Sequence, residues 1–364
     1  MNRPSDAEAV EVLRRLVEIP SVSGHEAGAV TFLVETMQRL GMAAWVDGAG
    51  NAVGVREEKG ELASSSEEDP GERSETLLLG HIDTVPGAIP VRIEDGRLYG
   101  RGSVDAKGPL VAFVVAAARA PLKGGQRLVV VGAVEEEAAS SKGAHYVAGR
   151  YQPDFCIIGE PSGWDTITLG YKGRLQLDFH AEQPMRHTAG PGEGVAEKAV
   201  AWWNHIAAYS MEYSHGRERL FEQLLPSLHH IQTESDGLVN RAVVNVGLRL
   251  PPNFDVAPLR TLARRCAGEA TVRVHSHEPA FQASRRTPLV RAFNVALRGH
   301  GRPPRFTLKT GTSDMNVVGP RWGCPIVAYG PGDSELDHTP GEHIIIEDYL
   351  RAIAVLEEVF ALSG

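Results

Sequence analysis

Apolar residues recur in the first forty residues with the three-to-four-residue spacing of amphipathic helices. The first helix is expected over residues 6–18 and ends before Pro20, which cannot continue it. The second is expected to end at Gly41, a residue typical of helix C-termini. The apolar positions that define the two helices are Val10, Leu13, Leu16, Val17, Val30, Leu33, Val34, Met37 and Leu40.

Short apolar runs then alternate with helical patterns up to about residue 159. This alternation is typical of an α/β sheet with helices on both faces. The segment 57–75 interrupts it, and its Glu, Ser, Gly and Pro content favours a mobile surface loop. The expected strands are 43–46, 52–56, 76–79, 127–134 and 154–159, and the expected helices are 108–119 and 140–149.

The pattern changes after Gly170, where strands with antiparallel-style alternation surround two helices. We therefore expect a small α+β domain over 173–283, inserted into a larger domain made of 1–172 and 284–364. The elements expected in the insertion are strands 175–181, 243–250 and 271–277 with helices 192–208 and 255–267. The chain then returns through a helix at 287–300, a strand at 326–329 and a last helix at about 346–362.

Composition narrows the class of protein. A chain of 364 residues is long enough for two domains, and 42% hydrophobic residues can form a real core. A net charge of −9 argues against a general nucleic-acid binder. Apolar stretches such as 109–118 are too short to span a membrane. The cysteines Cys156, Cys266 and Cys324 are far apart and imply no disulfide framework, so we expect a reducing compartment, the cytoplasm.

Acidic and imidazole side chains follow several of the predicted strands, and others lie in loops. Ligands in α/β sheets gather beyond the carboxyl ends of strands. Two histidines with several carboxylates and no cysteine suit two divalent metal ions, and a further Glu can act as a base. The residues concerned are His81, Asp83, Asp105, Glu135, Glu136, Glu160 and His338.

Each of these signals has a simpler interpretation. A single His-x-Asp is often structural, and Asp105 could cap a turn. The run Glu135–Glu137 could be a solvated helix start, which is our expectation for Glu137. Neighbouring residues at a strand end point to different sides, so one Glu of this run can bind a metal while the next faces a water. Glu160 follows a buried strand, where a carboxylate without a role would be costly.

Together the motifs resemble the acetylornithine deacetylase, succinyl-diaminopimelate desuccinylase and carboxypeptidase G family of metallohydrolases over nearly the whole chain. The motifs that carry the resemblance are His81-x-Asp83, Gly102–Gly108, Glu135–Glu136, Gly159–Ser162 and Asp337–Pro340.

The resemblance implies a site with two zinc or cobalt ions. His81 and Glu160 would hold one ion, Glu136 and His338 the other, and Asp105 would bridge them. It further implies Glu135 as the general base, Asp83 as the partner of His81, and a cis peptide at Asp105–Ala106.

The resemblance also implies a metallopeptidase-type catalytic domain with a mixed sheet, and a lid of four strands and two helices that forms a homodimer. His187 matches a lid histidine that stabilises the oxyanion across the dimer. Arg249, Lys172 and the Gly311–Thr312 loop match positions that bind substrate, with Arg249 suited to a carboxylate.

Two stretches, 169–173 and 309–316, look most like one branch of this family. Its members release lysine or ornithine from the C-terminal glutamate of a small acidic amino-group carrier protein in amino-acid biosynthesis. Between Arg260 and Lys309 eleven Lys or Arg residues stand against two acids, a local charge of about +9 that would steer an acidic partner. These arginines could instead pair with nearby acids.

Two other functions remain open. A small-molecule N-acyl-amino-acid deacylase, such as an acetylornithine deacetylase, would use the same catalytic residues, so only substrate assays separate it from the carrier hydrolase. A catalytically inactive binding protein on this fold would have lost ligands, whereas every expected ligand is present.

Overall fold

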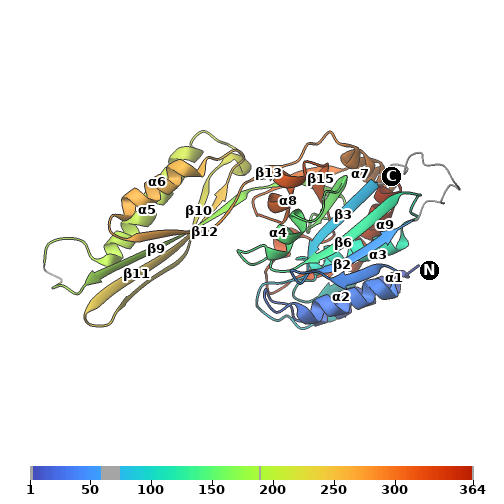
Figure 1. Ribbon diagram of the computed structural model, residues 1–364, viewed down its shortest axis with the longest axis horizontal. Helices are drawn as coiled ribbons and strands as arrows, with labels where there is room; N and C mark the ends of the chain where they lie inside the picture. Colours follow the sequence, from blue (N-terminus) through green and yellow to red (C-terminus); the bar gives the residue numbers. More distant parts are fainter. Residues whose placement is uncertain (1–2, 59–73, 188–189, 363–364) are drawn as a thin grey trace. The chain divides into compact units, whose positions relative to one another are not determined.

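The computed structural model describes residues 3–58, 74–187 and 190–362. Within these the chain divides into two compact units (Figure 1). Unit 1 contains Met1–Gly170, Ala283–Leu308 and Ser313–Gly364, and unit 2 contains Tyr171–Gln282 with Lys309–Thr312. Unit 2 corresponds to the insertion expected over 173–283, with one short later segment added. Most of the surface loop expected at 57–75 lies outside the described residues.

A mixed sheet runs through unit 1 in the order β1-β2-β6-β3-β7-β15-β8, and β14 also pairs with β8. The strands β6, β3, β7 and β15 run parallel to one another, whereas β1 and β2 are antiparallel to their neighbours. This confirms the α/β class. The strand bounds are β1 Ala43–Val46, β2 Ala52–Glu57, β3 Ser74–His81, β6 Gln126–Ala133, β7 Phe155–Gly159, β8 Thr166–Tyr171, β14 Arg305–Lys309 and β15 Ile326–Ala328.

Helix α3 (Lys107–Arg119) lies at the centre of unit 1, with its first eleven residues all buried. Its apolar residues join one core with α1, α2, α7, α9 and alternate residues of the sheet such as Leu78 and Val130. Helices α4 and α8 pack against each other and contact β6 and β15. Among the described residues, no helix is both long and apolar enough to span a membrane. The bounds are α1 Asp6–Glu18, α2 Ala27–Arg39, α4 Lys142–Ala148, α7 Pro288–Gly299, α8 Met315–Trp322 and α9 Ile346–Leu362.

The parallel strands end side by side, and glycines let α3 approach them closely there. Gly80 of β3 pairs with Gly159 of β7. A Cβ on Gly159 would lie 2.8 Å from the Phe113 ring and 3.1 Å from the Gly80 Cα, so any larger residue would push α3 away from the sheet. The polar residues that follow these strands are consequently brought to one edge of the sheet.

Several elements of the structure were not expected from the sequence. One is a small sheet in the order β16-β5-β4, whose strands are only three residues long. Strands β4 and β5 come before α3 in the chain, and β16 comes directly before α9. The sequence does not reveal strand β10 in unit 2, because most of its residues are exposed and its apolar residues Leu225, Leu228 and Ile231 do not alternate with polar ones. The bounds are β4 Arg92–Glu94, β5 Arg97–Tyr99, β13 Phe281–Gln282 and β16 His343–Ile345.

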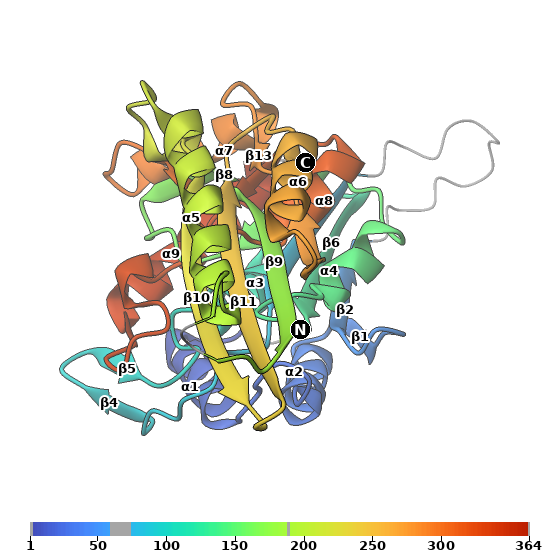
Figure 2. The ribbon, with the colours of Figure 1, turned by 90° about the vertical axis from the view of Figure 1, so that its left-hand side faces the viewer.

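Unit 2 is an antiparallel sheet in the order β10-β11-β9-β12, with α5 and α6 on one face (Figure 2). Alternate residues of β9, from Leu175 to Ala181, face these helices and form a separate core. This matches the lid of four strands and two helices that the family resemblance implied. The bounds are β9 Gly173–Pro184, α5 Val195–Ser214, β10 Leu225–Ser235, β11 Val239–Leu250, α6 Val256–Ala267 and β12 Thr271–Glu278.

The side chain of Trp202 links both helices of unit 2 to its sheet. It is fully buried on α5, its ring lies 5.1 Å from that of Phe179 on β9, and its Nε1 donates to the Ala263 carbonyl of α6 at 2.9 Å. We expect Trp202→Ala to lower the free energy of unfolding of this unit by about 3–5 kcal/mol, because it leaves a cavity and removes the hydrogen bond to the Ala263 carbonyl.

Urea unfolding of the full chain, followed by far-UV circular dichroism, measures this loss. Trp203→Ala is the matched control, since Trp203 is only partly buried at the rim of the same core. Equal losses of unfolding free energy in the two variants would show that Trp202 contributes no more to the core than Trp203 does.

Candidate active site

The carboxylate of Asp105 lies between two imidazoles from distant parts of unit 1. Its Oδ1 is 3.1 Å from His81 Nε2, and its Oδ2 is 3.0 Å from His338 Nε2. Asp105 precedes α3, and the Asp105–Ala106 peptide is cis, as expected. His338 lies in the loop between β15 and β16 with a positive φ of 62°. This shared carboxylate fits the bridging position expected for Asp105.

Asp83 contacts both the His81 ring and the backbone of the acidic run. His81 is 1% exposed, and its Nδ1 lies 3.0 Å from the Asp83 carbonyl and 3.5 Å from the Asp83 carboxylate. The two carboxylate oxygens of Asp83 accept the backbone N–H groups of Glu136 and Glu137, each at 3.0 Å, and Oδ2 also accepts Ser23 Oγ at 2.7 Å. Asp83 therefore fixes both an imidazole and the acidic segment after β6.

Glu137, rather than Glu136, brings its carboxylate to the two histidines. Its Oε1 is 2.9 Å from His338 Nε2, and its side chain is 11% exposed. One ligand atom each from His81, Asp105 and Glu137 lies within 4.8 Å of the others. The expectation that Glu137 is a solvated residue is therefore wrong, and we infer that the metal-ligand role first given to Glu136 belongs to Glu137.

The backbone at Glu135 explains the shift by one residue. Its φ is +58°, a left-handed conformation that is uncommon outside glycine and breaks the strand alternation at this point. The Glu135 carboxylate turns to Ser140 Oγ at 2.6 Å and Lys142 Nζ at 3.4 Å. Since it is engaged by these two residues rather than by the histidines or Asp105, the geometry does not support Glu135 as the base.

Glu136 lies among other carboxylates, which fits it for proton transfer. Burial raises the pKa of its carboxyl well above the ordinary value, and the charges of Glu160, Asp314 and Glu137 act in the same direction, while His81 opposes them. The charges of His81, Glu160 and Glu137 all act on the Glu136 carboxyl, so it lies close to the candidate metal ligands without being paired with Asp105 or His338. We infer from this position that Glu136 is the candidate base. Glu160, 9% exposed after β7, belongs to the same electrostatic neighbourhood.

The two imidazoles are strongly polarised by their carboxylate partners. Burial alone would lower the pKa of His81, but Asp105, Asp83 and Glu136 raise it well above the usual range. Hydrogen bonds that His338 donates to Asp105 and Glu137 raise the pKa of its imidazole to about 10. Burial would raise the pKa of Asp105, yet the two histidines hold it well below its usual value. Positive charge is needed here to hold so many carboxylates together.

This donor set fits a site for two divalent metal ions. Imidazole nitrogens and carboxylate oxygens, with no thiolate, are ligands for zinc and comparable ions. A carboxylate with one oxygen directed at each histidine can bridge two ions roughly 3.5–4 Å apart.

In unit 2, three of the predicted substrate-binding residues come together. Arg249 Nη1 donates to Thr312 Oγ1 at 2.8 Å, and Thr312 Oγ1 donates to the Lys172 carbonyl at 3.1 Å. Arg249 is exposed at the end of β11. Gly311 lies beside Thr312, and a Cβ on Gly311 would meet no atom within 4 Å. The guanidinium and the loop form one polar surface that can accept a carboxylate.

The ammonium of Lys172 contacts backbone carbonyls of unit 2. Lys172 is fully buried, and its Nζ donates to the carbonyls of Leu220, Phe221 and Gln223. Burial, together with the charge of Arg249, lowers the pKa of Lys172 to about 8. Through these contacts Lys172 supports the 220–223 turn, and its role as a substrate ligand stays a prediction. His187 lies exposed in the segment between β9 and α5.

An α/β sheet with imidazoles and carboxylates gathered at its strand ends defines a metal-dependent hydrolase. The family model described as peptidase family M20/M25/M40 matches residues 77–361, and the chain belongs to that family. Among solved structures, the chain resembles an M20 family metallo-carboxypeptidase from Sulfolobus solfataricus, with a TM-score of 0.72 and 21% identity, covering 98% of this chain and 99% of that one. It also resembles a dinuclear metal-binding peptidase of the M20 family from Bacillus subtilis, with a TM-score of 0.67 and 14% identity, covering 98% and 97%.

Two sequence relatives are more specific. A LysW-lysine hydrolase from Deinococcus radiodurans is 44% identical over 98% of this chain and 97% of its own length. A putative LysW-lysine/LysW-ornithine hydrolase from Thermococcus kodakarensis is 42% identical over 98% and 92%.

The reassignment within the acidic run leads to a direct prediction about metal binding. Loss of a residue that hydrogen-bonds to a metal ligand typically weakens metal binding by roughly 10–100-fold. Glu137→Gln removes a proposed ligand itself, so it should weaken zinc binding by at least that much. Glu135→Gln should leave it unchanged, because its carboxylate is directed to Ser140 and Lys142. Titration of the metal-free variants with zinc against a chromophoric chelator measures both. Weak binding in Glu135→Gln with normal binding in Glu137→Gln would contradict the reassignment.

Proposed function

We propose that this protein is a metal-dependent amide hydrolase that releases lysine, or ornithine, from the C-terminal glutamate of an amino-group carrier protein. The bond cleaved would join the glutamyl γ-carboxyl of the carrier to the α-amino group of the released amino acid. The observation that carries the proposal is the Asp105 carboxylate shared by His81 and His338, with Glu137 beside them. The 44% identity with a LysW-lysine hydrolase supports the choice of substrate.

The residues that would hold two zinc or cobalt ions are His81, Glu160, Glu137 and His338, with Asp105 between them. When bound, such ions polarise an amide carbonyl and make a water more acidic. Three of these residues already place ligand atoms within 4.8 Å of one another. The identity of the metal used in the cell is left to experiment.

The chain's own residues would then move the protons. Glu136 takes a proton from the attacking water and passes it to the nitrogen of the leaving amine. Asp83 supports this step in two ways, since it orients His81 and fixes the backbone of Glu136. We propose that His187 donates a hydrogen bond to the developing oxyanion.

The carboxylate of the released amino acid would rest on the polar surface of unit 2. Arg249 presents its guanidinium beside Thr312, and Gly311 leaves room for a ligand to approach the backbone. An arginine can bind a carboxylate through two parallel hydrogen bonds, which fixes its orientation as well as its charge.

The basic segment 260–309 is divided between the two units. Arg260, Arg264, Arg265 and Arg273 belong to unit 2, whereas the residues from Arg285 to Arg305 belong to unit 1. Arg305 pairs with Asp165, and Arg285 stacks on the Phe306 ring. Four further arginines of this segment in unit 1 are exposed, namely Arg286, Arg291, Arg298 and Arg302.

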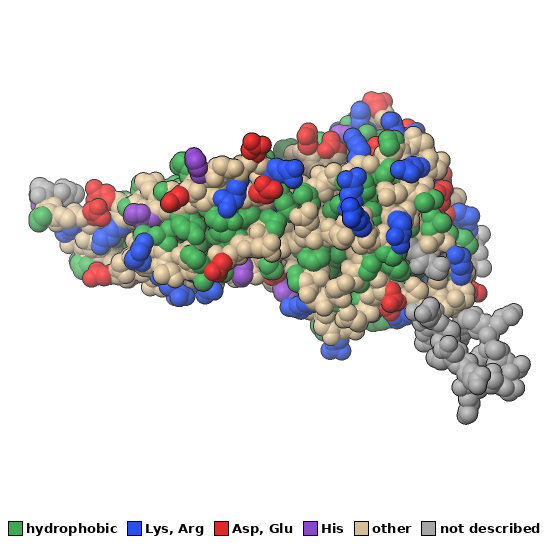
Figure 3. Space-filling view, turned by 90° about the horizontal axis from the view of Figure 1, so that it is seen from above, with side chains coloured by type: hydrophobic (Ala, Val, Ile, Leu, Met, Phe, Trp, Pro, Cys, Tyr) green, Lys and Arg blue, Asp and Glu red, His purple; other side chains and the backbone are tan. Residues whose placement is uncertain are grey.

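These four residues lie on and around α7, and Figure 3 shows Lys and Arg side chains close together on the face of unit 1 where α7 lies. We propose this α7 surface as the place where an acidic carrier approaches, since a local excess of positive charge accelerates encounter with a negative partner.

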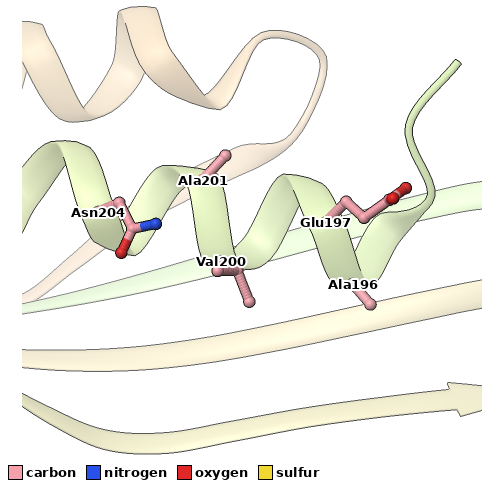
Figure 4. A pocket seen from close by; sticks show the side chains of 5 residues that line it. All are labelled: Ala196, Glu197, Val200, Ala201 and Asn204. Carbon is pink, nitrogen blue, oxygen red and sulfur yellow. The ribbon is translucent and has the colours of Figure 1, made fainter.

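We further propose that the protein forms a homodimer through unit 2. Strand β10 is an edge of the unit 2 sheet, and its Leu228 and Ile231 are 39% and 42% exposed. On the adjoining helix α5, Val200 is 48% exposed and lines a shallow hollow with Ala196, Glu197, Ala201 and Asn204 (Figure 4). An unpaired strand edge beside an apolar helix face is a natural surface for a second copy.

The substrate assay tests the proposed function. We expect zinc- or cobalt-loaded protein to release lysine or ornithine from the carrier adduct much faster than from acetylornithine. Glu136→Gln should keep its metals and lower kcat by about 10²–10⁴-fold, because it removes the proton carrier only. Faster release from acetylornithine would overturn the carrier as substrate and favour a small-molecule deacylase.

The α7 surface supplies an internal control for the same assay. Replacing Arg291 and Arg298 by Glu should lower kcat/KM for the carrier adduct by about tenfold or more at low salt and leave a small substrate unaffected. Equal effects on both substrates would show that the variant harms the protein in general.

Sedimentation velocity tests the proposed dimer. Ile231→Glu should convert the protein to a monomer, since a buried unpaired charge is costly at an interface, and Val295→Glu, at an exposed position on α7, should not. If His187 acts across the dimer, the monomer will bind metal normally and lose turnover. A monomeric wild-type protein would contradict the proposal.

A further inference from the structure

Glu342 is a buried acid four residues after His338 whose contacts the reaction does not require. Its side chain is 0% exposed. Its Oε1 accepts the backbone N–H groups of Val104 at 3.0 Å and Asp105 at 3.2 Å. The carbonyl of Glu342 also accepts the N–H of Gly100 at 3.3 Å. Both the side chain and the backbone of Glu342 therefore hold the turn that carries Asp105.

Arg101 completes the arrangement from the other side. Its Nη1 donates to Glu342 Oε2 at 2.7 Å, and its Nε donates to the Gly87 carbonyl at 3.0 Å. Its Nη2 lies 3.5 Å from the carbonyl of His338. Arg101 is 14% exposed, so the ion pair with Glu342 is largely removed from water.

These contacts tie together two segments that are far apart in the chain. Residues 100–105 carry the shared carboxylate, and residues 338–342 carry one of its imidazole partners. His338 has a left-handed backbone with φ of 62°, a conformation that surrounding contacts must hold. The contact of Arg101 with the His338 carbonyl helps to hold this backbone conformation.

We propose that Glu342 and Arg101 are positioning residues for the metal site, forming a latch that sets the distance and angle between Asp105 and His338. The latch is defined as the side chains of these two residues, and neither is among the proposed metal ligands. It acts through the backbone amides of Val104 and Asp105 and through the His338 carbonyl. The inference rests on the proposed two-metal function of the site.

Two chemical reasons favour a carboxylate and a guanidinium here. A carboxylate can accept several N–H groups at once, which a neutral side chain of the same size does less well. A guanidinium has five donors in a fixed fork, so it can reach Glu342, Gly87 and His338 together. Partners that orient metal ligands in this way commonly control metal affinity.

The alternative is that the ion pair of Glu342 and Arg101 stabilises the fold without affecting the metal site. Another ion pair of the chain serves as a matched control for this alternative. Glu357 on α9 pairs with Arg119 at the opposite end of α3 from Asp105. The side chains of Glu357 and Arg119 are 12% and 8% exposed, close to the burial of the latch. Glu357 also pairs with Arg3, so its ionic contacts lie with residues outside the metal site.

Zinc titration of full-length protein against a chromophoric chelator tests the latch. We expect Glu342→Gln to raise the zinc Kd by about 10–100-fold. Glu357→Gln should lower the melting temperature and leave the zinc Kd unchanged. In the metal-free state, hydrogen exchange of the Val104 and Asp105 amides should be faster in Glu342→Gln than in wild type or Glu357→Gln, because their acceptor is weakened.

Arg101→Lys keeps the positive charge and serves if Glu342→Gln does not fold. It should also weaken zinc binding, since an ammonium cannot reach all three acceptors. Normal zinc affinity in every folded latch variant would overturn the proposal. Absence of zinc binding by the wild-type protein would instead overturn the metal function on which the latch rests.

Discussion

Several carboxylates gathered at one edge of a sheet require positive charge, and the rest of the active site depends on this constraint. Asp105, Glu136, Glu137 and Glu160 lie in a shielded region where unbalanced negative charge would be costly. Within the described structure, His81 and His338 contact Asp105 and balance part of the negative charge. Divalent metal ions would balance more of it. The same arrangement favours the binding of divalent ions. Their positive charge would lower the pKa of the Glu136 carboxyl from the raised value that burial and the neighbouring carboxylates give it.

The topology of unit 1 explains how residues spread over the sequence reach this one place. Parallel strands β3, β6 and β7 end together, so His81, the acidic run and Glu160 converge without long loops. Glycines at these strand ends allow α3 to lie directly against them, and α3 in turn presents Asp105 at its start. His338 arrives from a late loop, and its position depends on contacts that cross the sequence from Arg101 and Glu342. Unit 2 adds a separate polar surface around Arg249 and Thr312.

Much of the fold and most of the site could be predicted from the sequence, because strand and helix periods and the order of the motifs are strong signals. Strand alternation failed in the acidic run after β6. The φ of Glu135 is positive, and Glu137 rather than Glu136 contacts His338. No local pattern marks such a turn, although the third Glu of the run was a possible signal. The contacts of the buried Lys172 ammonium with backbone carbonyls could not be predicted either, because the carbonyls belong to a turn some fifty residues later in the chain. Glu342 was overlooked because its partners lie more than two hundred residues away.

Anomalous diffraction at the zinc edge from crystals of the zinc-loaded protein would test the central assignment most directly. The site geometry predicts two peaks roughly 3.5–4 Å apart with Asp105 between them. Glu137 and His338 should ligate one ion, His81 and Glu160 the other, and Glu136 should face the gap without ligating either. A single peak, or two peaks with Glu136 as a ligand and Glu137 directed to solvent, would contradict it.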